Sequence, residues 1–508
     1  MPTVIQGRDF PERGVSSALL ISPPVYDTQY WADWSQPYGL LRIGAWLKAR
    51  GYKRVELFDF MEVDEQNRVH KHRIEPDGEY WDQGKPRGIV KPIVIRKGGE
   101  SLELYKYHFG KTWEEFQDWL EAIGYIKRPP NEVYISAIMT YWWESVRDLT
   151  KRLKRLWGNR TTIFLGGIYP TLAPEHAARF TEADFVVVGE VPEANDLWTD
   201  LSFYERPPRY AIITPARGCP FNCAYCAQKV INNGRKATEF RNPEDVVAEM
   251  RDKYERFGIK GFAFYADQLL WRPEENLGKV LELVVQEKLP FRLHAPEGLD
   301  TRQLSKSQSF VDLLKKARFQ KIYLPLENID ESYLAMMNRK HVKPDHYVKA
   351  VEMCEKAGFR TRNMAVNTFV LYGLPGETID SVVKTILFAS EVSGSIIPML
   401  FTPVPGSLIY RRHEDYIKAR GWHERLEMLN GKIFPFLEMN EGSIEDYIDL
   451  QRLMYTLNAH YRSKSFRIFG KTAVSVCFRE NISNGFYERV LKEFDKEKRH
   501  EPEAQRRG

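Results

Sequence analysis

The sequence predicts an α/β protein in which an open, mostly parallel sheet is followed by a partial (β/α)6 barrel and a helical C-terminal region. Short apolar runs alternate with amphipathic helical stretches up to about residue 200, and the same alternation returns up to residue 410. This rhythm is typical of parallel sheets. A cysteine-rich loop, TPARGCPFNCAYCAQK, lies near the start of the second series. The predicted domains are therefore residues 1–205, 206–410 and 411–508.

The N-terminal domain has five predicted strands, which cover residues 16–22, 54–60, 132–139, 162–165 and 184–188. Predicted helices at residues 39–50 and 144–157 fall between them. An insertion at about residues 62–130 contains a hairpin around KGGE and a helix near residues 113–123. The insertion either decorates the surface or helps to recognise a substrate. Ligands of such sheets bind beyond the carboxyl ends of the strands, which here carry SPPVYDT, MTYWWE, GGIYPT and GE.

The second domain has six predicted strands, which cover residues 210–214, 261–265, 291–295, 321–326, 367–371 and 398–402. Six strand–helix units indicate a partial barrel, whose ligands are expected at the C-terminal face by analogy with full barrels. The final 98 residues are expected to form helices that end in a charged tail, within residues 411–508.

Three cysteines, Cys219, Cys223 and Cys226, have the spacing C-x3-C-x2-C. Three thiolates on one loop suit an iron–sulfur cluster and would leave one iron of a [4Fe–4S] cluster open to a substrate or cofactor. A structural zinc site would need a fourth Cys or a His nearby, and none lies between Cys226 and Met250.

This loop, with Tyr225 before the third cysteine, resembles that of the radical S-adenosylmethionine (radical SAM) enzymes, and the resemblance covers roughly residues 208–410. It implies that the open iron binds S-adenosylmethionine and that electron transfer cleaves it to a 5′-deoxyadenosyl radical. An electron donor such as flavodoxin or ferredoxin is then an expected partner.

The resemblance also implies cofactor contacts along the barrel. Asp267 is a positional candidate only, because the family's GGE string is absent at this strand end. Glu327 keeps the family's acid, although Asn328 replaces its usual Ser. Gly373, Pro375 and Gly376 belong to the family-like string G-x-P-G-E-T, which could also be a simple helix-capping turn.

The N-terminal strings PYGLLRIGAWLKARGY, GGIYPTLAPE and DFVVVGE resemble the cobalamin-binding domain of one branch of these enzymes. No D-x-H-x-x-G string is present, so cobalamin is expected to bind without a lower His ligand. Glycines would let the corrin approach the backbone, but they also suit a tight turn. A domain that kept the fold and lost the cofactor is the alternative. The implied cobalamin contacts are Tyr141, Trp142, Gly166, Gly167, Ile168, Tyr169, Pro170, Gly189 and Glu190.

The resemblance as a whole implies a cobalamin-dependent radical SAM methyltransferase that methylates an unactivated carbon through the 5′-deoxyadenosyl radical and methylcobalamin. The alternatives are ring closure or oxidation, as in anaerobic chlorophyll-ring cyclases, and a non-catalytic cobalamin-binding protein. A methylthiotransferase is disfavoured because only Cys354 and Cys477 remain for a second cluster. The substrate stays open among protein side chains, lipids, tetrapyrroles and natural-product precursors, and no residue is assigned as catalytic.

The composition of the chain limits its expected partners and location. A net charge of +5 among 74 basic and 69 acidic residues gives no strong case for nucleic acid binding. Five cysteines, three of them in one loop, favour a reducing compartment over a disulfide framework. No run of ~20 apolar residues is present, so we expect no membrane span and a cytoplasmic location.

Overall fold

The computed structural model describes residues 2–11, 16–30, 36–62, 68–74, 80–84, 86–234, 238–462, 483 and 485–492. The chain forms two compact units. The first contains residues 1–94, 103–263 and 403–430, and the second contains residues 95–102, 264–402 and 431–508. The predicted three-domain division stays a prediction. Cys477 and most of the charged tail lie outside the described residues.

The first unit is built on a six-stranded parallel sheet, which confirms the predicted α/β class. Its strand order is β1-β11-β10-β9-β2-β4. The bounds are β1 Thr3–Gln6, β2 Ser17–Ser22, β4 Arg54–Asp59, β9 Glu132–Ser136, β10 Thr162–Gly166 and β11 Phe185–Val188. Five of these strands match the prediction, whereas the edge strand β1 was not predicted.

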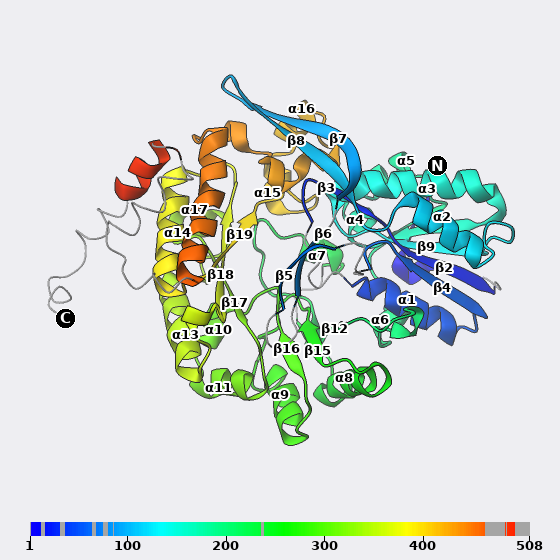
Figure 1. Ribbon diagram of the computed structural model, residues 1–508, viewed down its shortest axis with the longest axis horizontal. Coiled ribbons are helices and arrows are strands. Elements are labelled where there is room, and N and C mark those ends of the chain that lie inside the picture. The colour runs from blue at the N-terminus through cyan, green and yellow to red at the C-terminus, as the bar shows by residue number, and fades with distance from the viewer. Residues whose placement is uncertain are drawn as a thin grey trace. The chain divides into compact units, whose positions relative to one another are not determined.

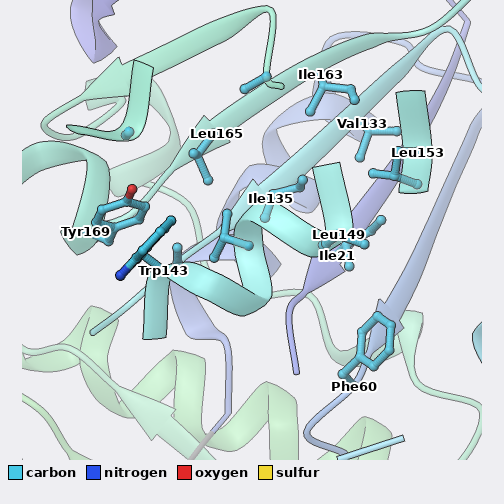
Figure 2. Close-up of a cluster of buried hydrophobic side chains, with 14 of the residues drawn as sticks. Ile21, Phe60, Val133, Ile135, Trp143, Leu149, Leu153, Ile163, Leu165 and Tyr169 are labelled. Atoms are coloured by element: carbon cyan, nitrogen blue, oxygen red, sulfur yellow. The ribbon is translucent and has the colours of Figure 1, made fainter. Parts of the chain in front are cut away.

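Both faces of this sheet are buried, because successive side chains of a strand point to opposite faces. In β9, Val133 and Ile135 belong to one apolar cluster and Tyr134 to another. Figure 2 shows the first cluster, in which Ile21, Ile163 and Leu165 join the β9 side chains. Burial on both faces explains why these strands read as continuous apolar runs in the sequence.

Helices cover each face (Figure 1). Residues of α2 Trp113–Ala122, α3 Trp143–Trp157 and α5 Pro174–Phe180 join the first cluster. Residues of α1 Tyr38–Ala49 and α6 Pro192–Asn195 join the second. In α3, Val146, Leu149 and Leu153 follow a helical spacing and turn one apolar stripe to the sheet. A short helix, α4 Ile168–Leu172, follows β10.

The insertion forms β-structure beside the main sheet. The predicted hairpin consists of β7 Pro86–Lys97 and β8 Glu100–Phe109, and a second hairpin consists of β5 Arg68–Ile74 and β6 Tyr80–Gly84. The strand β3 Val25–Asp27, in a segment predicted as a loop, pairs antiparallel with β8. The insertion is therefore tied to the first loop of the parallel sheet.

The first unit also holds the beginning of the predicted barrel and a returning segment. The barrel part contains β12 Tyr210–Ile213, β13 Ala216–Arg217, α7 Gln228–Ile231, β14 Glu239–Phe240, α8 Pro243–Phe257 and most of β15 Gly261–Phe264. The returning segment, residues 403–430, contains α15 Leu408–Arg412, α16 Glu414–Ala419 and the 3-10 turn η6 Leu426–Leu429.

The second unit contains the remaining predicted strands, β16 Arg292–His294, β17 Ile322–Glu327, β18 Val366–Tyr372 and β19 Ile396–Leu400. The last three pair in parallel in that order. Its helices are α9 Leu277–Gln286, α10 Thr301–Leu304, α11 Gln308–Lys316, α12 Glu331–Met336, α13 Pro344–Ala357, α14 Ile379–Val392 and α17 Ile444–Arg462. Among the helices described, none combines the length and apolar character needed to cross a membrane.

Candidate functional site

The three clustered cysteines lie on the loop between β13 and α7. Cys219 and Cys223 are half-buried and Cys226 is exposed. The Cys226 amide donates to the Cys223 carbonyl at 3.1 Å, which closes a turn, and the Gln228 amide donates to the Cys226 Sγ at 3.4 Å. The half-buried Tyr225 lies within this turn, and its predicted cofactor contact stays a prediction.

Neighbouring segments hold the cysteine loop in shape. The Ile409 amide, from the returning segment, donates to the Ala224 carbonyl at 2.9 Å. The Thr238 hydroxyl donates to the Gly218 carbonyl at 3.0 Å, and Arg217 forms an ion pair with Glu190. The loop is thus fixed by the parallel sheet and by residues about 190 positions further along the chain.

The donor set of this loop fits a cluster. None of the three cysteines is joined in a disulfide, and a cluster distributes its thiolates over separate irons. Within the described ranges, no three His, Cys, Asp or Glu side chains form a group that could hold a single metal ion. The loop therefore offers thiolates for a cluster, and it matches poorly the compact four-ligand arrangement of a structural zinc site.

The carboxyl end of β10 carries the predicted glycine pair. Gly167 has φ +102°, and a Cβ there would lie 2.4 Å from the Ala137 carbonyl oxygen. Gly166 has room, since the nearest atom to its Cβ would be Val187 Cβ at 3.8 Å. The close approach of the Ala137 backbone thus explains why residue 167 is a glycine, as the tight-turn alternative proposed. At Gly166, by contrast, the backbone at the sheet edge is left uncovered.

A Gly167→Ala substitution is expected to destabilise the first unit by roughly 1–3 kcal/mol, because alanine would require a strained φ and a clash with backbone. Urea denaturation monitored by circular dichroism would measure this loss. Gly166→Ala is the matched control and is expected to unfold at nearly the wild-type urea concentration. Equal stability of the two variants would contradict the structural explanation of Gly167.

In the segment after Gly167, some side chains are buried in the core of the first unit and others lie at the edge of the sheet. The Tyr169 ring is fully buried, and its hydroxyl lies 2.8 Å from His176 Nδ1. Pro170 is buried as well, whereas Ile168 is half-buried. Burial places the Tyr169 ring in the core, so a corrin contact at this residue would be made by its backbone; the predicted contact stays a prediction.

The loop after β9 presents apolar side chains at the same edge. β9 ends at Ser136 and not at residue 139 as predicted. Ile138 and Met139 therefore lie in the loop, where they are 40% and 41% exposed. Tyr141 and Trp142 follow in a 3-10 turn, η2 Thr140–Trp142, and both are half-buried. Ile138 and Met139 were missed because they read as the end of a strand.

A buried ionic cluster lies behind this loop. Lys106, whose side chain is 1% exposed, pairs with Glu144 at 2.8 Å. Lys91 pairs with Glu144 at 2.8 Å and with Glu427 at 3.0 Å. Glu427 also accepts from the Trp143 indole at 2.9 Å. Burial lowers the pKa of Lys106, and its pairing with Glu144 opposes that shift.

Gly189 and Glu190, at the end of β11, lie against the cysteine loop. A Cβ at Gly189 would come within 3.1 Å of the Asn233 side chain, which follows α7. The Gly189 amide donates to the Thr171 hydroxyl at 3.0 Å, and Glu190 pairs with Arg217. These two predicted corrin contacts therefore join the sheet edge to the cysteine loop.

Two predicted acids lie in the second unit. Asp267 is half-buried beyond β15. Near it lies Glu297, an exposed residue that was not predicted. Desolvation by the surrounding protein and the negative charge of Asp267 both act to raise its pKa. Glu327 ends β17 with φ +64° at a bulge, an uncommon conformation that often marks a functional position.

Asn328, the departure from the family's Ser, has a structural role. It is 1% exposed, and its Oδ1 accepts from the Asp330 amide at 2.8 Å and from the Thr385 hydroxyl at 3.2 Å. The amide side chain thus ties the end of β17 to α14.

The G-x-P-G-E-T string forms a turn after β18 that is anchored from two sides. Gly373 and Gly376 have φ +90° and +77°. The Gly373 amide donates to Glu377 Oε1, and the Gly376 amide donates to Asn440 Oδ1, each at 2.8 Å. Pro375 is buried and Gly376 is exposed, so the turn presents its second glycine outward.

Burial raises the pKa of Glu377, 1% exposed, to about 8, although the Gly373 amide partly stabilises the charge. From about pH 5 to 8 the folded chain therefore keeps a proton that the unfolded chain has lost, and stability should fall as pH rises through this window. In Glu377→Gln, which cannot titrate at this position, the free energy of unfolding is expected to fall less between pH 5 and pH 8, by an amount on the order of a few kcal/mol. Thermal unfolding of both proteins at pH 5 and pH 8 measures it. An unchanged pH dependence in the variant would contradict a protonated Glu377.

Comparison with known proteins now adds to the geometry. The family model of the radical SAM superfamily matches residues 213–389, which include the cysteine loop and the G-x-P-G-E-T turn. This chain carries a radical SAM domain. The match begins at the last residue of β12 and ends within α14, so the radical SAM domain runs through both compact units.

Two relatives are similar to part of this chain. The chain is 25% identical over 305 residues to the bacteriochlorophyllide d C-8(2)-methyltransferase of Chlorobaculum tepidum, covering 50% of this chain and 62% of that protein. It is 26% identical over 223 residues to a tRNA-2-methylthio-N(6)-dimethylallyladenosine synthase of Thermoanaerobacter sp., covering 42% and 44%. The chain thus spans roughly half the length of these relatives.

Among solved structures, the radical S-adenosylmethionine methyltransferase TsrM from Kitasatospora setae has a similar fold. With tryptophan and a SAM analogue bound, it matches with a TM-score of 0.54 and 14% identity, covering 79% of this chain and 76% of that chain. TsrM with cobalamin and a [4Fe–4S] cluster bound matches with a TM-score of 0.52 and 13% identity, over 82% and 75%. The shared fold therefore extends beyond the radical SAM domain to most of this chain.

Proposed function

We propose that the protein is a cobalamin-dependent radical SAM enzyme that transfers a methyl group to an unactivated carbon of its substrate. The observation that carries the proposal is the arrangement inside the first unit. There, the carboxyl edge of the parallel sheet and the cysteine loop are joined directly by the Arg217–Glu190 ion pair. A site for a flat cofactor and a site for a cluster are thus held next to each other.

The sheet edge suits a flat ring. The exposed side chains of Ile138 and Met139 supply apolar surface, and the unobstructed backbone at Gly166 leaves room for close approach. Apolar walls with few polar groups are typical of cofactor sites. Cobalamin, bound without a lower His ligand, would lie against these residues, with Trp142 at the side of the loop.

The cysteine loop would hold a [4Fe–4S] cluster through Cys219, Cys223 and Cys226. Bound cluster and cobalamin supply the radical and methyl-transfer chemistry, which belongs to the cofactors. The chain's own share is to position them. The Gln228 amide donates to the Cys226 sulfur, and such bonds tune cluster potentials. In the second unit, Asp267, Glu327 and the turn at Gly373 and Gly376 are the candidates for binding S-adenosylmethionine.

The test is anaerobic purification with hydroxocobalamin supplied, followed by iron and cobalt analysis and by incubation with S-adenosylmethionine, a reductant and candidate substrates. We expect about four irons and one cobalt per chain, together with 5′-deoxyadenosine and S-adenosylhomocysteine as products. A substrate that gains one CH2 unit in mass supports methylation. Iron without cobalt would refute the cobalamin part, and a product without the added CH2 would favour ring closure or oxidation.

Among substrates, tetrapyrroles are the first class to assay, since one relative is a bacteriochlorophyllide methyltransferase. Protein side chains, lipids and other natural-product precursors follow. Flavodoxin and ferredoxin are the electron donors to compare with a chemical reductant, because the cluster needs one electron for each cleavage. Faster cleavage with either protein donor would identify the class of partner.

A further inference from the structure

A buried carboxylate lies behind the loop that carries Tyr141 and Trp142. Asp27, the last residue of β3, is 0% exposed. Its Oδ2 accepts from the Trp142 indole Nε1 at 2.8 Å. Its Oδ1 accepts from the Thr28 amide at 2.6 Å and from the Asn430 side-chain amide at 2.9 Å. One carboxylate therefore joins its own segment to two others that are far apart in the sequence.

The bond to Trp142 differs from those that hold core tryptophans. Trp142 is half-buried, it packs against the first apolar cluster, and Tyr30 and Tyr141 meet its ring at steep angles, 62° and 81°. These apolar contacts have little directional preference. The Nε1–Oδ2 bond adds a directional contact that fixes the plane of the ring, and bonds to a charged acceptor are the stronger ones.

The same carboxylate acts on the next side chain. Burial and the negative charge of Asp27 together raise the pKa of Tyr141, so its phenol stays protonated. Asn430, which holds Asp27 from the other side, ends the η6 turn that also contributes Glu427 to the ionic cluster. Asp27 is therefore held by Asn430 on one side while it bonds the Trp142 indole on the other.

We propose that Asp27 is a positioning residue: through Trp142 Nε1 it sets the plane of the indole as one wall of the site for a flat tetrapyrrole ring at the sheet edge. The inference rests on the proposed function, in which that ring is cobalamin. It assigns a role in ligand affinity to a carboxylate on the short strand β3, although its own atoms are buried behind the wall.

The test measures hydroxocobalamin affinity of the full chain by absorbance titration, for wild type, Trp142→Phe, Asp27→Ala and the double variant. Trp142→Phe keeps an aromatic ring but removes the indole N–H. We expect each single variant to bind about tenfold more weakly, in line with the loss of a bond to a charged group. The double variant should bind no more weakly than Asp27→Ala, because both substitutions remove the same interaction.

Two further variants separate positioning from general damage. Asp27→Asn keeps a carbonyl oxygen as acceptor and should recover part of the affinity. Trp157→Phe removes another indole N–H, which donates to the Tyr125 carbonyl at 3.1 Å in the core, and should leave affinity unchanged. The absorbance spectrum of bound cobalamin should shift in Trp142→Phe and Asp27→Ala, and stay as in wild type in Trp157→Phe.

The outcomes distinguish the inference from the function on which it rests. Wild-type protein that fails to bind hydroxocobalamin refutes the proposed function and the inference with it. Wild-type binding with unchanged affinity in Trp142→Phe, or additive losses in the double variant, refutes only the positioning role. If Asp27→Ala does not fold, the comparison of Trp142→Phe with Trp157→Phe and with Asp27→Asn still decides.

Discussion

Replacing Cys223 by alanine is expected to abolish S-adenosylmethionine cleavage and to remove nearly all iron from the purified protein. The two remaining thiolates cannot hold three irons of a cluster. The loop contains no fourth cysteine that could replace Cys223. Iron content by colorimetry and 5′-deoxyadenosine by liquid chromatography measure the two effects.

The matched control is Cys354→Ala. Cys354 is 0% exposed on α13 in the second unit, and burial raises the pKa of its thiol to about 12, which makes it a poor ligand. This variant should keep its iron and its cleavage activity and lose only packing stability. Retention of full iron by Cys223→Ala would show that the cluster does not depend on this loop.

Replacing Lys106 by methionine is expected to lower the free energy of unfolding by roughly 3 kcal/mol. Removing one partner of a buried ion pair leaves the other charge uncompensated. Lys91 still bonds Glu144, which keeps the loss at the low end of the usual range. The midpoint of urea denaturation, followed by tryptophan fluorescence, measures the change.

The double variant Lys106→Met with Glu144→Gln tests the cause. It restores charge balance, because Lys91 and Glu427 still neutralise each other at 3.0 Å. Most of the lost stability should return if the uncompensated carboxylate is responsible. A double variant as unstable as Lys106→Met alone would instead attribute the loss to the packing of the lysine stem.

The parallel sheet could be predicted because its signal is local. The apolar run around Val133 and Ile135 is long enough to mark a strand, although its end was placed at Met139 instead of Ser136. The edge strand Thr3–Gln6 gives no such signal, since most of its side chains are exposed and its place depends on pairing with β11. Strand ends and edges depend on tertiary contacts that local pattern does not encode.

In the candidate site as well, some residues could be predicted from local sequence and others could not. Spacing alone identified the three cysteines, because a cluster needs thiolates close together in space. The role of Asp27 had no local signal: its partner Trp142 is 115 residues away and Asn430 is 403 residues away. Gly167 was picked out for its lack of a side chain, and only the position of Ala137 showed which neighbour requires it.

The return of residues 403–430 to the first unit has a consequence for how the chain is made. Synthesis proceeds from the N-terminus, and domains generally fold as they emerge from the ribosome. The parallel sheet can assemble once residue 188 has emerged, but the bonds from Asn430 to Asp27 and from Glu427 to Trp143 must wait for more than two hundred further residues. Until then the cysteine loop lacks the bond from Ile409 to Ala224, so the loop is completed only after residues 403–430 have been made.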